Sequence, residues 1–206
     1  MKIDIQQYRI LQEIYDYFNK ELFKNELPEV VFIIDYRKST NLGYFHFEKL
    51  EQNGKPMSII SLNPDKFNRE NIDTISTLVH EMCHAWRYYK SEKEPTPGYH
   101  DKIWSKKMES IGLTPSSDGT ETGKKTGVRM HHIIKHDGLF ELKAKTYIES
   151  KEYIFLFQGI ADIKTTKAAS SRNKTKYTCN CGENIWGKPG LQATCNLCNS
   201  IFKSYE

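Results

Sequence analysis

Residues Thr77 to Trp86 read T-L-V-H-E-M-C-H-A-W, and the H-E-x-x-H pattern of His80, Glu81 and His84 decides how the chain is interpreted. In a helix, residues four positions apart lie on the same face, so the two imidazoles can reach one metal ion. Glu81 lies beside them and is suited to act as a base toward water at that metal. The pattern therefore predicts a catalytic zinc site on a helix.

The residues around this pattern predict that the helix is buried. Apolar side chains recur at helical spacing from Ile72 to Trp86 and form a wide stripe, and Asn71 or Asp73 can cap the start of the helix. Polar side chains held against such a core are costly unless a ligand or a hydrogen bond satisfies them. A bound metal would satisfy the histidines.

Catalytic zinc generally has three protein ligands, so one more ligand is needed. The extended pattern with a third histidine requires Gly and His at two positions where this chain has Arg87 and Lys90, and this excludes the metzincin class. His100 follows a Pro-Gly turn and is expected to open a core-packed helix over 100–112. Such a position aims a side chain accurately, so His100 is preferred as the third ligand. Carboxylate alternatives are Glu109 on the same helix and the loop residues Glu92 and Glu94.

The remaining patterns predict an α+β fold. An amphipathic helix is expected first, and short strands rich in β-branched residues follow it. The helix is predicted at 3–23, strands at 30–34, 42–48, 58–62, 131–134 and 153–157, a turn at 54–56, and an exposed loop at 114–127. The edge of strand 58–62 is a candidate site for an extended substrate to add as a further strand.

Other residues that can carry chemistry have simpler interpretations. Cys83 is expected to be a buried apolar residue, and Trp86 and Trp104 to be core anchors. The three histidines of the segment after the loop are expected to lie in loops or on the surface; they are His131, His132 and His136.

Composition predicts an intracellular globular protein. Of the 206 residues, 38% are hydrophobic and 27% are charged, which allows a substantial core. No apolar run is long enough to cross a bilayer and the N-terminus has no apolar signal core, so no membrane association and a cytoplasmic location are expected.

Four of the five cysteines are crowded near the C-terminus, as Cys179-x-Cys181 and Cys195-x-x-Cys198, with thirteen residues between the pairs. Four thiolates at this spacing can hold a structural zinc ion, which would stabilise a module too small to fold on its own core. We therefore predict a metalloprotease domain at 1–160, a basic linker at 161–176 and a zinc ribbon at 177–206. Two zinc ions are expected, one catalytic and one structural.

The positive charge of the chain is concentrated in this tail. Residues 164–206 contain seven Lys or Arg residues against two acidic residues. Basic groups beside aromatic rings suit the phosphates and bases of a single nucleic-acid strand. The candidate DNA-binding residues are Lys174, Lys176, Trp186 and Lys188, with Tyr177 and Tyr205 as neighbouring aromatics.

Several separate motifs together resemble the SprT family, in its bacterial or phage-type form. They are Leu22-Phe23 and Leu27-Pro28, Gly43-Tyr44-Phe45, His80 to Trp86, and Gly98 to Trp104 followed by Met108, Ile111 and Gly112. The family comprises zincin-like metalloprotease domains related to the eukaryotic Spartan proteases. The resemblance implies a minimal zincin core, made of a helix, a small mostly antiparallel sheet, the H-E-x-x-H helix and a following helix. It also implies His80, His84 and His100 as zinc ligands and Glu81 as the catalytic residue.

The resemblance further implies cleavage of proteins that are crosslinked or tightly bound to DNA. The expected protein is a monomeric zinc endopeptidase that acts on protein substrates, contacts single-stranded or junction DNA, and works in the cytoplasm or at the nucleoid. The alternative is a catalytically inactive zincin-fold protein that binds nucleic acid or serves as a scaffold. The intact Glu81 argues against this alternative, because a structural metal site has no use for a base.

Overall fold

The computed structural model describes residues 2–36, 41–90, 95–152, 154–157 and 174–204. The chain divides into two compact units, Met1–Ala161 and Asp162–Glu206. The first unit contains α1 (Ile3–Phe23), β1 (Val30–Ile34), β2 (Gly43–Gln52), β3 (Lys55–Leu62), the 3-10 helix η1 (Pro64–Lys66), α2 (Asn71–Lys90), α3 (Lys102–Ser110), β4 (Leu113–Ser116), β5 (His131–Ile134) and α4 (Leu139–Glu149). The second unit contains β6 (Thr175–Thr178), β7 (Asn184–Gly187) and β8 (Lys203–Ser204).

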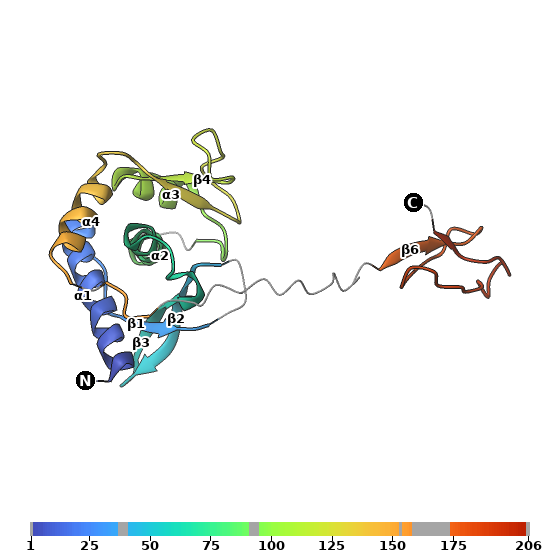
Figure 1. The fold of residues 1–206 in the computed structure, drawn as a ribbon, viewed down its shortest axis with the longest axis horizontal. Helices are drawn as coiled ribbons and strands as arrows, with labels where there is room; N and C mark the ends of the chain where they lie inside the picture. Colours follow the sequence, from blue (N-terminus) through green and yellow to red (C-terminus); the bar gives the residue numbers. More distant parts are fainter. Residues whose placement is uncertain (1, 37–40, 91–94, 153, 158–173, 205–206) are drawn as a thin grey trace. The chain divides into compact units, whose positions relative to one another are not determined.

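The helix that carries H-E-x-x-H, α2, is the centre of the first unit. It packs against α1, α3, α4, β2 and β3, and Figure 1 looks nearly along its axis, with α3 on one side and the three-stranded sheet on the other. The predicted apolar stripe is buried: Ile75, Leu78, Val79 and Met82 belong to one continuous core. The helix is therefore held in place by contacts with five other elements.

The three-stranded sheet has the order β1-β3-β2, which places β3 in the middle. β3 pairs in parallel with β1 and antiparallel with β2, so the expectation of a mostly antiparallel sheet holds for only one of its two pairings. The prediction that strand 58–62 offers its edge to a substrate is wrong, because both of its edges are occupied by neighbouring strands. Among the described residues of this sheet, β2 pairs with β3 along one edge and with no strand along its other edge.

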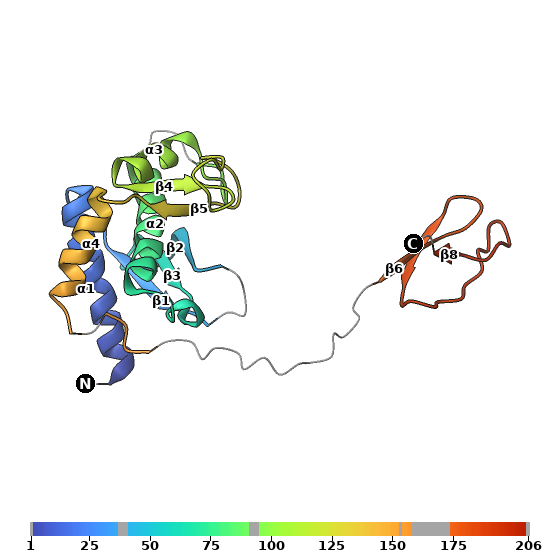
Figure 2. The same cartoon turned by 45° about the horizontal axis from the view of Figure 1, so that its top comes forward.

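Other sequence predictions differ from the structure in detail. The turn of the β2–β3 hairpin is Asn53-Gly54, both with left-handed φ angles (53° and 78°), as in a two-residue hairpin turn. Pro56, which was expected in the turn, lies in β3 opposite Glu51, outside the part of β3 that pairs with β1. The described residues 154–157 form no strand, and the sequence analysis missed α4, which lies beside α1 (Figure 2).

The second unit is a small three-stranded sheet of order β7-β6-β8. The buried residues in the part of this unit that the structure describes, 174–204, are Tyr177, Cys179, Cys195 and Phe202, so two of the four are cysteines. β6 begins at Thr175, inside the range predicted as linker, and residues 161–173 of that linker lie outside the described residues. Within the described parts of the chain, no helix combines the length and the apolar character needed to cross a membrane.

Candidate functional site

Three histidines from different segments converge beside α2. Each of His80, His84 and His100 offers a ring nitrogen, and these atoms lie within 4.8 Å of one another. His80 and His84 are one turn apart on α2, and His100 lies just before α3. The indole of Trp104 underlies all three imidazoles, with ring centroids 4.4–5.3 Å away, and is itself only 1% exposed. The buried indole of Trp104 thus packs against all three imidazoles and restricts their positions.

The spacing of the ring nitrogens fits a zinc ion. His100 Nε2 and His80 Nε2 are 3.3 Å apart. Two nitrogens bound to tetrahedral zinc at about 2.0–2.1 Å would be separated by about 3.3–3.4 Å. Burial lowers the pKa of all three histidines, that of His84 to about 3, so the rings are neutral at pH 7. Neutral imidazole is the form that binds metals.

His100 is held by a backbone bridge rather than by a helix start. Its backbone exchanges two hydrogen bonds with Gly127, of 2.8 and 3.1 Å, and its Nδ1 lies 3.1 Å from the Gly127 carbonyl oxygen. The expected helix over 100–112 begins instead at Lys102, and Asp101 is its N-cap, accepting hydrogen bonds from the backbone N–H groups of Ile103 and Trp104. His100 is nevertheless adjacent to Asp101, the residue that caps α3.

An ion pair ties this helix start to α2. Arg87 Nη2 and Nε lie 2.6 and 2.8 Å from Asp101 Oδ2, and the arginine side chain is 3% exposed. Burial alone would raise the pKa of Asp101, but the hydrogen bonds from Arg87 and from Trp104 N–H lower it below the ordinary value. Arg87, one of the two residues that exclude the metzincin pattern, thus links α2 to the start of α3.

We expect Asp101→Ala to lower the free energy of unfolding by about 2–4 kcal/mol, because it removes a helix cap and the carboxylate that pairs with a buried guanidinium. Asp101→Asn keeps a cap acceptor and should lose less. Urea unfolding followed by far-ultraviolet circular dichroism measures both variants. A decrease in unfolding free energy of less than about 1 kcal/mol for the alanine variant would contradict the role of Asp101 as helix cap and ion-pair partner.

Glu81 is buried and faces the sheet. Burial raises the pKa of its carboxyl to about 8, although a hydrogen bond from the backbone of Phe45 acts in the opposite direction. Gly43 also lies close: a Cβ atom there would come 3.3 Å from Glu81 Cγ and 3.1 Å from the Ser61 carbonyl oxygen. The open strand β2 therefore packs directly against the candidate base.

The cluster opens into a cleft of about 1190 Å³. One wall is formed by residues 41–45 at the start of β2, and another by residues 128–134, which include β5. His80, Glu81, His84 and His100 all line the cleft. The arrangement can therefore present a metal ion and a carboxylate to a ligand that enters between these walls.

The expectation that His132 is a loop or surface residue is wrong. It lies on β5 in contact with His80, whose Nδ1 is 3.2 Å from His132 Nδ1. Burial lowers its pKa to about 4. His131 and His136 are exposed as expected. The alternation of neighbouring residues along a strand is the signal that could have separated His132 from His131.

Of the glutamate alternatives for the third ligand, the one that the structure describes does not join the cluster. Glu109 is exposed on α3 and is absent from the histidine group, while Glu92 and Glu94 lie outside the described residues. Cys83 is fully buried, and burial raises its pKa, so it behaves as the apolar residue that was expected. Trp104 is a core residue, and Trp86 is only partly buried.

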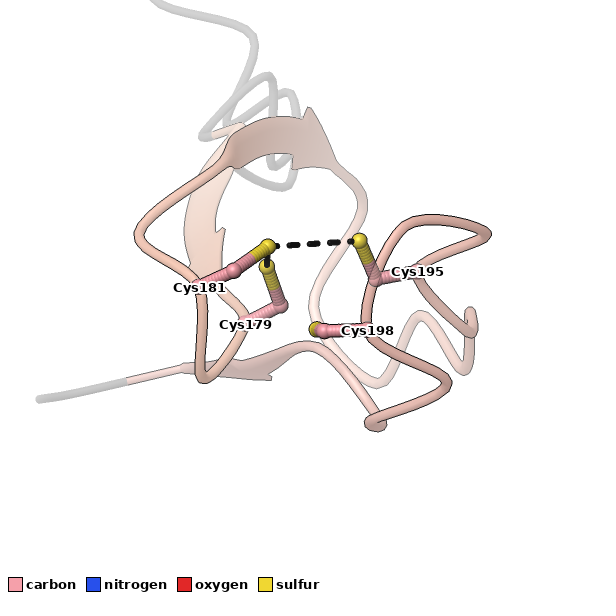
Figure 3. A group of neighbouring side chains, drawn as sticks. All are labelled: Cys179, Cys181, Cys195 and Cys198. Atoms are coloured by element: carbon pink, nitrogen blue, oxygen red, sulfur yellow. Dashed lines mark hydrogen bonds between the residues drawn. The ribbon is translucent and has the colours of Figure 1, made fainter.

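The four C-terminal cysteines also form one group, with their sulfur atoms within 4.8 Å of one another (Figure 3). The Sγ atoms of Cys181 and Cys195 are 3.7 Å apart, close to the separation of about 3.8 Å expected around tetrahedral zinc, and those of Cys179 and Cys181 are 3.2 Å apart. A hydrogen bond with Ser200, whose Oγ is 3.0 Å from the sulfur, lowers the pKa of Cys198 to about 6. This donor set is suited to a structural zinc ion.

The candidate DNA-binding residues lie on one face of the second unit. Lys176 and Trp186 are cross-strand partners in β6 and β7, and Lys174 and Lys188 are two positions away on the same strands or their extensions. All four are exposed, and Trp186 is 60% exposed. Tyr177 points to the other face, where its hydroxyl donates to the Lys188 carbonyl oxygen (2.8 Å). Its interpretation as a neighbouring binding aromatic is therefore wrong, and Tyr205 lies outside the described residues.

Comparison with known proteins gives one match. A family model described as the SprT-like family matches residues 11–128, which is more than half of the 206 residues. Searches of curated proteins and of solved structures found no match. The matched range includes His80, Glu81, His84 and His100 and ends before His132 and the four C-terminal cysteines.

Proposed function

Since the chain belongs to the SprT-like family, whose domain is generally of the metalloprotease type, we propose that it is a zinc-dependent endopeptidase. The observation that carries this proposal is the convergence of His80, His84 and His100 beside Glu81 in one cleft. A structural site needs only the ligands, whereas this one includes a carboxylate that the ligand set does not use.

In this proposal the three imidazoles hold the zinc ion and Glu81 moves the protons. When bound, zinc supplies a Lewis acid that polarises a peptide carbonyl and makes water more acidic. The Glu81 carboxylate takes a proton from the attacking water and delivers it to the nitrogen of the leaving amine. The hydrogen bond from the Phe45 backbone holds the carboxylate in place for both transfers. A nearby cation favours the ionised form of Glu81, in opposition to the effect of burial.

The substrate is proposed to lie along β2 rather than β3. β2 has an open edge among the described residues, and its first residues form a wall of the cleft beside Glu81. An extended peptide can add to such an edge through backbone hydrogen bonds, which gives affinity for many sequences. The side chains of residues 128–134 on the opposite wall would then contact the side chains of the substrate.

We further propose that the substrates are proteins bound or crosslinked to DNA, and that the second unit contacts the DNA. In support, Lys176 is the cross-strand partner of the exposed Trp186, and the exposed Lys174 and Lys188 lie two positions away along the chain. Lysines can pair with phosphates and an exposed indole can stack on a base, with little preference for sequence. The four cysteines would keep this face folded by holding the second zinc ion.

The test of the proposed function is cleavage of casein by the full chain. We expect proteolysis by the zinc-loaded protein, complete loss after chelation, and recovery when zinc is added back. A second arm uses a DNA-bound protein as substrate with and without single-stranded DNA, and stimulation by the DNA is expected there. No cleavage in either arm by protein that contains zinc would reject the protease, and cleavage without any DNA effect would reject the DNA-dependent role alone.

A further inference from the structure

His132 contacts the histidine cluster from outside. It comes from β5, 52 residues after His80 in the chain, and its Nδ1 lies 3.2 Å from His80 Nδ1. Its other ring nitrogen, Nε2, lies 2.8 Å from the Ser76 hydroxyl oxygen, one turn before His80 on α2. Both nitrogens of this partly buried ring are therefore engaged with α2.

The hydrogen bonds of this contact have only one consistent direction when His80 binds a metal. The Nε2 atom of His80 faces His100 and the metal position, so the proton of His80 is on Nδ1. His80 Nδ1–H then donates to His132 Nδ1, and His132 carries its own proton on Nε2. His132 Nε2–H donates to Ser76 Oγ, and the Ser76 hydroxyl donates to the backbone carbonyl of Asp73 at 2.8 Å. In this series of hydrogen bonds, His132 and Ser76 each accept one hydrogen bond and donate one.

His100, a second candidate ligand, also has its outer ring nitrogen engaged by the segment that leads into β5. His100 Nδ1 lies 3.1 Å from the carbonyl oxygen of Gly127, five residues before His132. Residues 127–132 therefore supply the partner of the outer nitrogen for two of the three candidate ligands. Partners of this kind fix the tautomer and the ring orientation of a metal-binding histidine.

We infer that His132 is a positioning residue for His80, acting as the acceptor that holds its ring in the metal-binding tautomer. This inference rests on the proposed zinc site and adds a residue outside the H-E-x-x-H pattern to it. Loss of such a partner typically weakens metal binding or activity by about 10–100-fold. A histidine that only filled space would be replaceable by any side chain of similar size.

Three substitutions separate these roles. Asparagine at position 132 places an oxygen acceptor at the δ position, where His132 has Nδ1, and so keeps the bond from His80. Glutamine places its amide at the ε position and so keeps the contact with Ser76 but not the one with His80. Leucine fills the volume and keeps neither. His132→Leu and His132→Gln should weaken cobalt binding at the histidine site by about 10–100-fold, while His132→Asn should stay within about threefold of the unsubstituted protein.

The experiment is a cobalt titration of the full chain, read by the visible absorption of the histidine-bound ion. The thiolate charge-transfer bands of the cysteine site serve as an internal control, since they should be the same in all proteins. Asparagine binding cobalt more tightly than glutamine by about threefold or more supports the inference, and any smaller difference or the reverse order overturns it. The comparison of these two amides stands even if the leucine variant does not fold.

The cobalt titration also distinguishes a failure of this inference from a failure of the proposed function. If the unsubstituted chain shows no histidine-type cobalt spectrum, the zinc site itself is rejected. If that spectrum is present and His132→Gln matches His132→Asn, only the role of His132 is rejected.

Discussion

Replacement of Glu81 by glutamine is expected to lower kcat/KM for casein by about 10²–10⁴-fold, because it removes the group that transfers protons while leaving the three imidazoles unchanged. Glutamine has nearly the same shape, and its side-chain oxygen can still accept the hydrogen bond from Phe45. The zinc content should therefore remain that of the unsubstituted protein. Cleavage rates and zinc content measured on the same preparation separate the loss of a base from the loss of the metal.

A matched control is Glu109→Gln on α3. Glu109 is exposed and lies outside the histidine group, so its substitution should change neither activity nor zinc content. Equal cleavage by Glu81→Gln and the unsubstituted protein would contradict the mechanism. Equal absence of cleavage in both, with zinc present, would favour the inactive scaffold that the sequence left as the alternative.

The chemistry of this site could be predicted from sequence because it depends on local spacing. The positions of His80, Glu81 and His84 on a helix follow from periodicity alone, and the apolar stripe around them predicts burial. The location of His100 after a turn was also accessible, although the backbone bridge to Gly127 that holds it was not. Pairings between distant segments leave no periodic signal in a single sequence.

The choice of the strand with an open edge was the main error. β3 was expected to have a free edge, but residues Ser58 to Leu62 are all buried, as is typical of a central strand. β2 carries Glu48, Lys49 and Glu51 and becomes exposed along its second half, as is typical of an edge strand. The charged residues of β2 were therefore the signal that could have identified it as an edge strand.

His132 was misjudged for a related reason. Its neighbours His131 and His136 are exposed, and alternation along the strand separates His132 from His131 without indicating which of the two faces α2. Only the antiparallel pairing of β5 with β4 turns it toward α2. Supporting residues of metal sites are thus harder to predict than the ligands, because their positions depend on tertiary contacts.

Simultaneous replacement of Cys195 and Cys198 by alanine is expected to unfold the second unit. Among the described residues of this unit, the buried ones are Tyr177, Phe202 and two cysteines, which is too little apolar surface to offset the entropy of ordering the segment. Zinc binding to cysteine-rich peptides of this size contributes about 10–16 kcal/mol, so most of the stability of the unit is expected to come from the metal. The zinc content should fall by one ion per chain, and the unit should become sensitive to proteases.

The same variant separates the two units in function. The histidine site belongs to the first unit, so cleavage of free casein should be unchanged, while stimulation by single-stranded DNA should be lost together with the folded face around Trp186. Cys83→Ala is the matched control, because that cysteine is buried in α2 and lies outside the cysteine group. A double variant that keeps two zinc ions and resists proteolysis would contradict the structural role of the cysteines. Retained DNA stimulation in an unfolded second unit would instead place the DNA contact on the first unit.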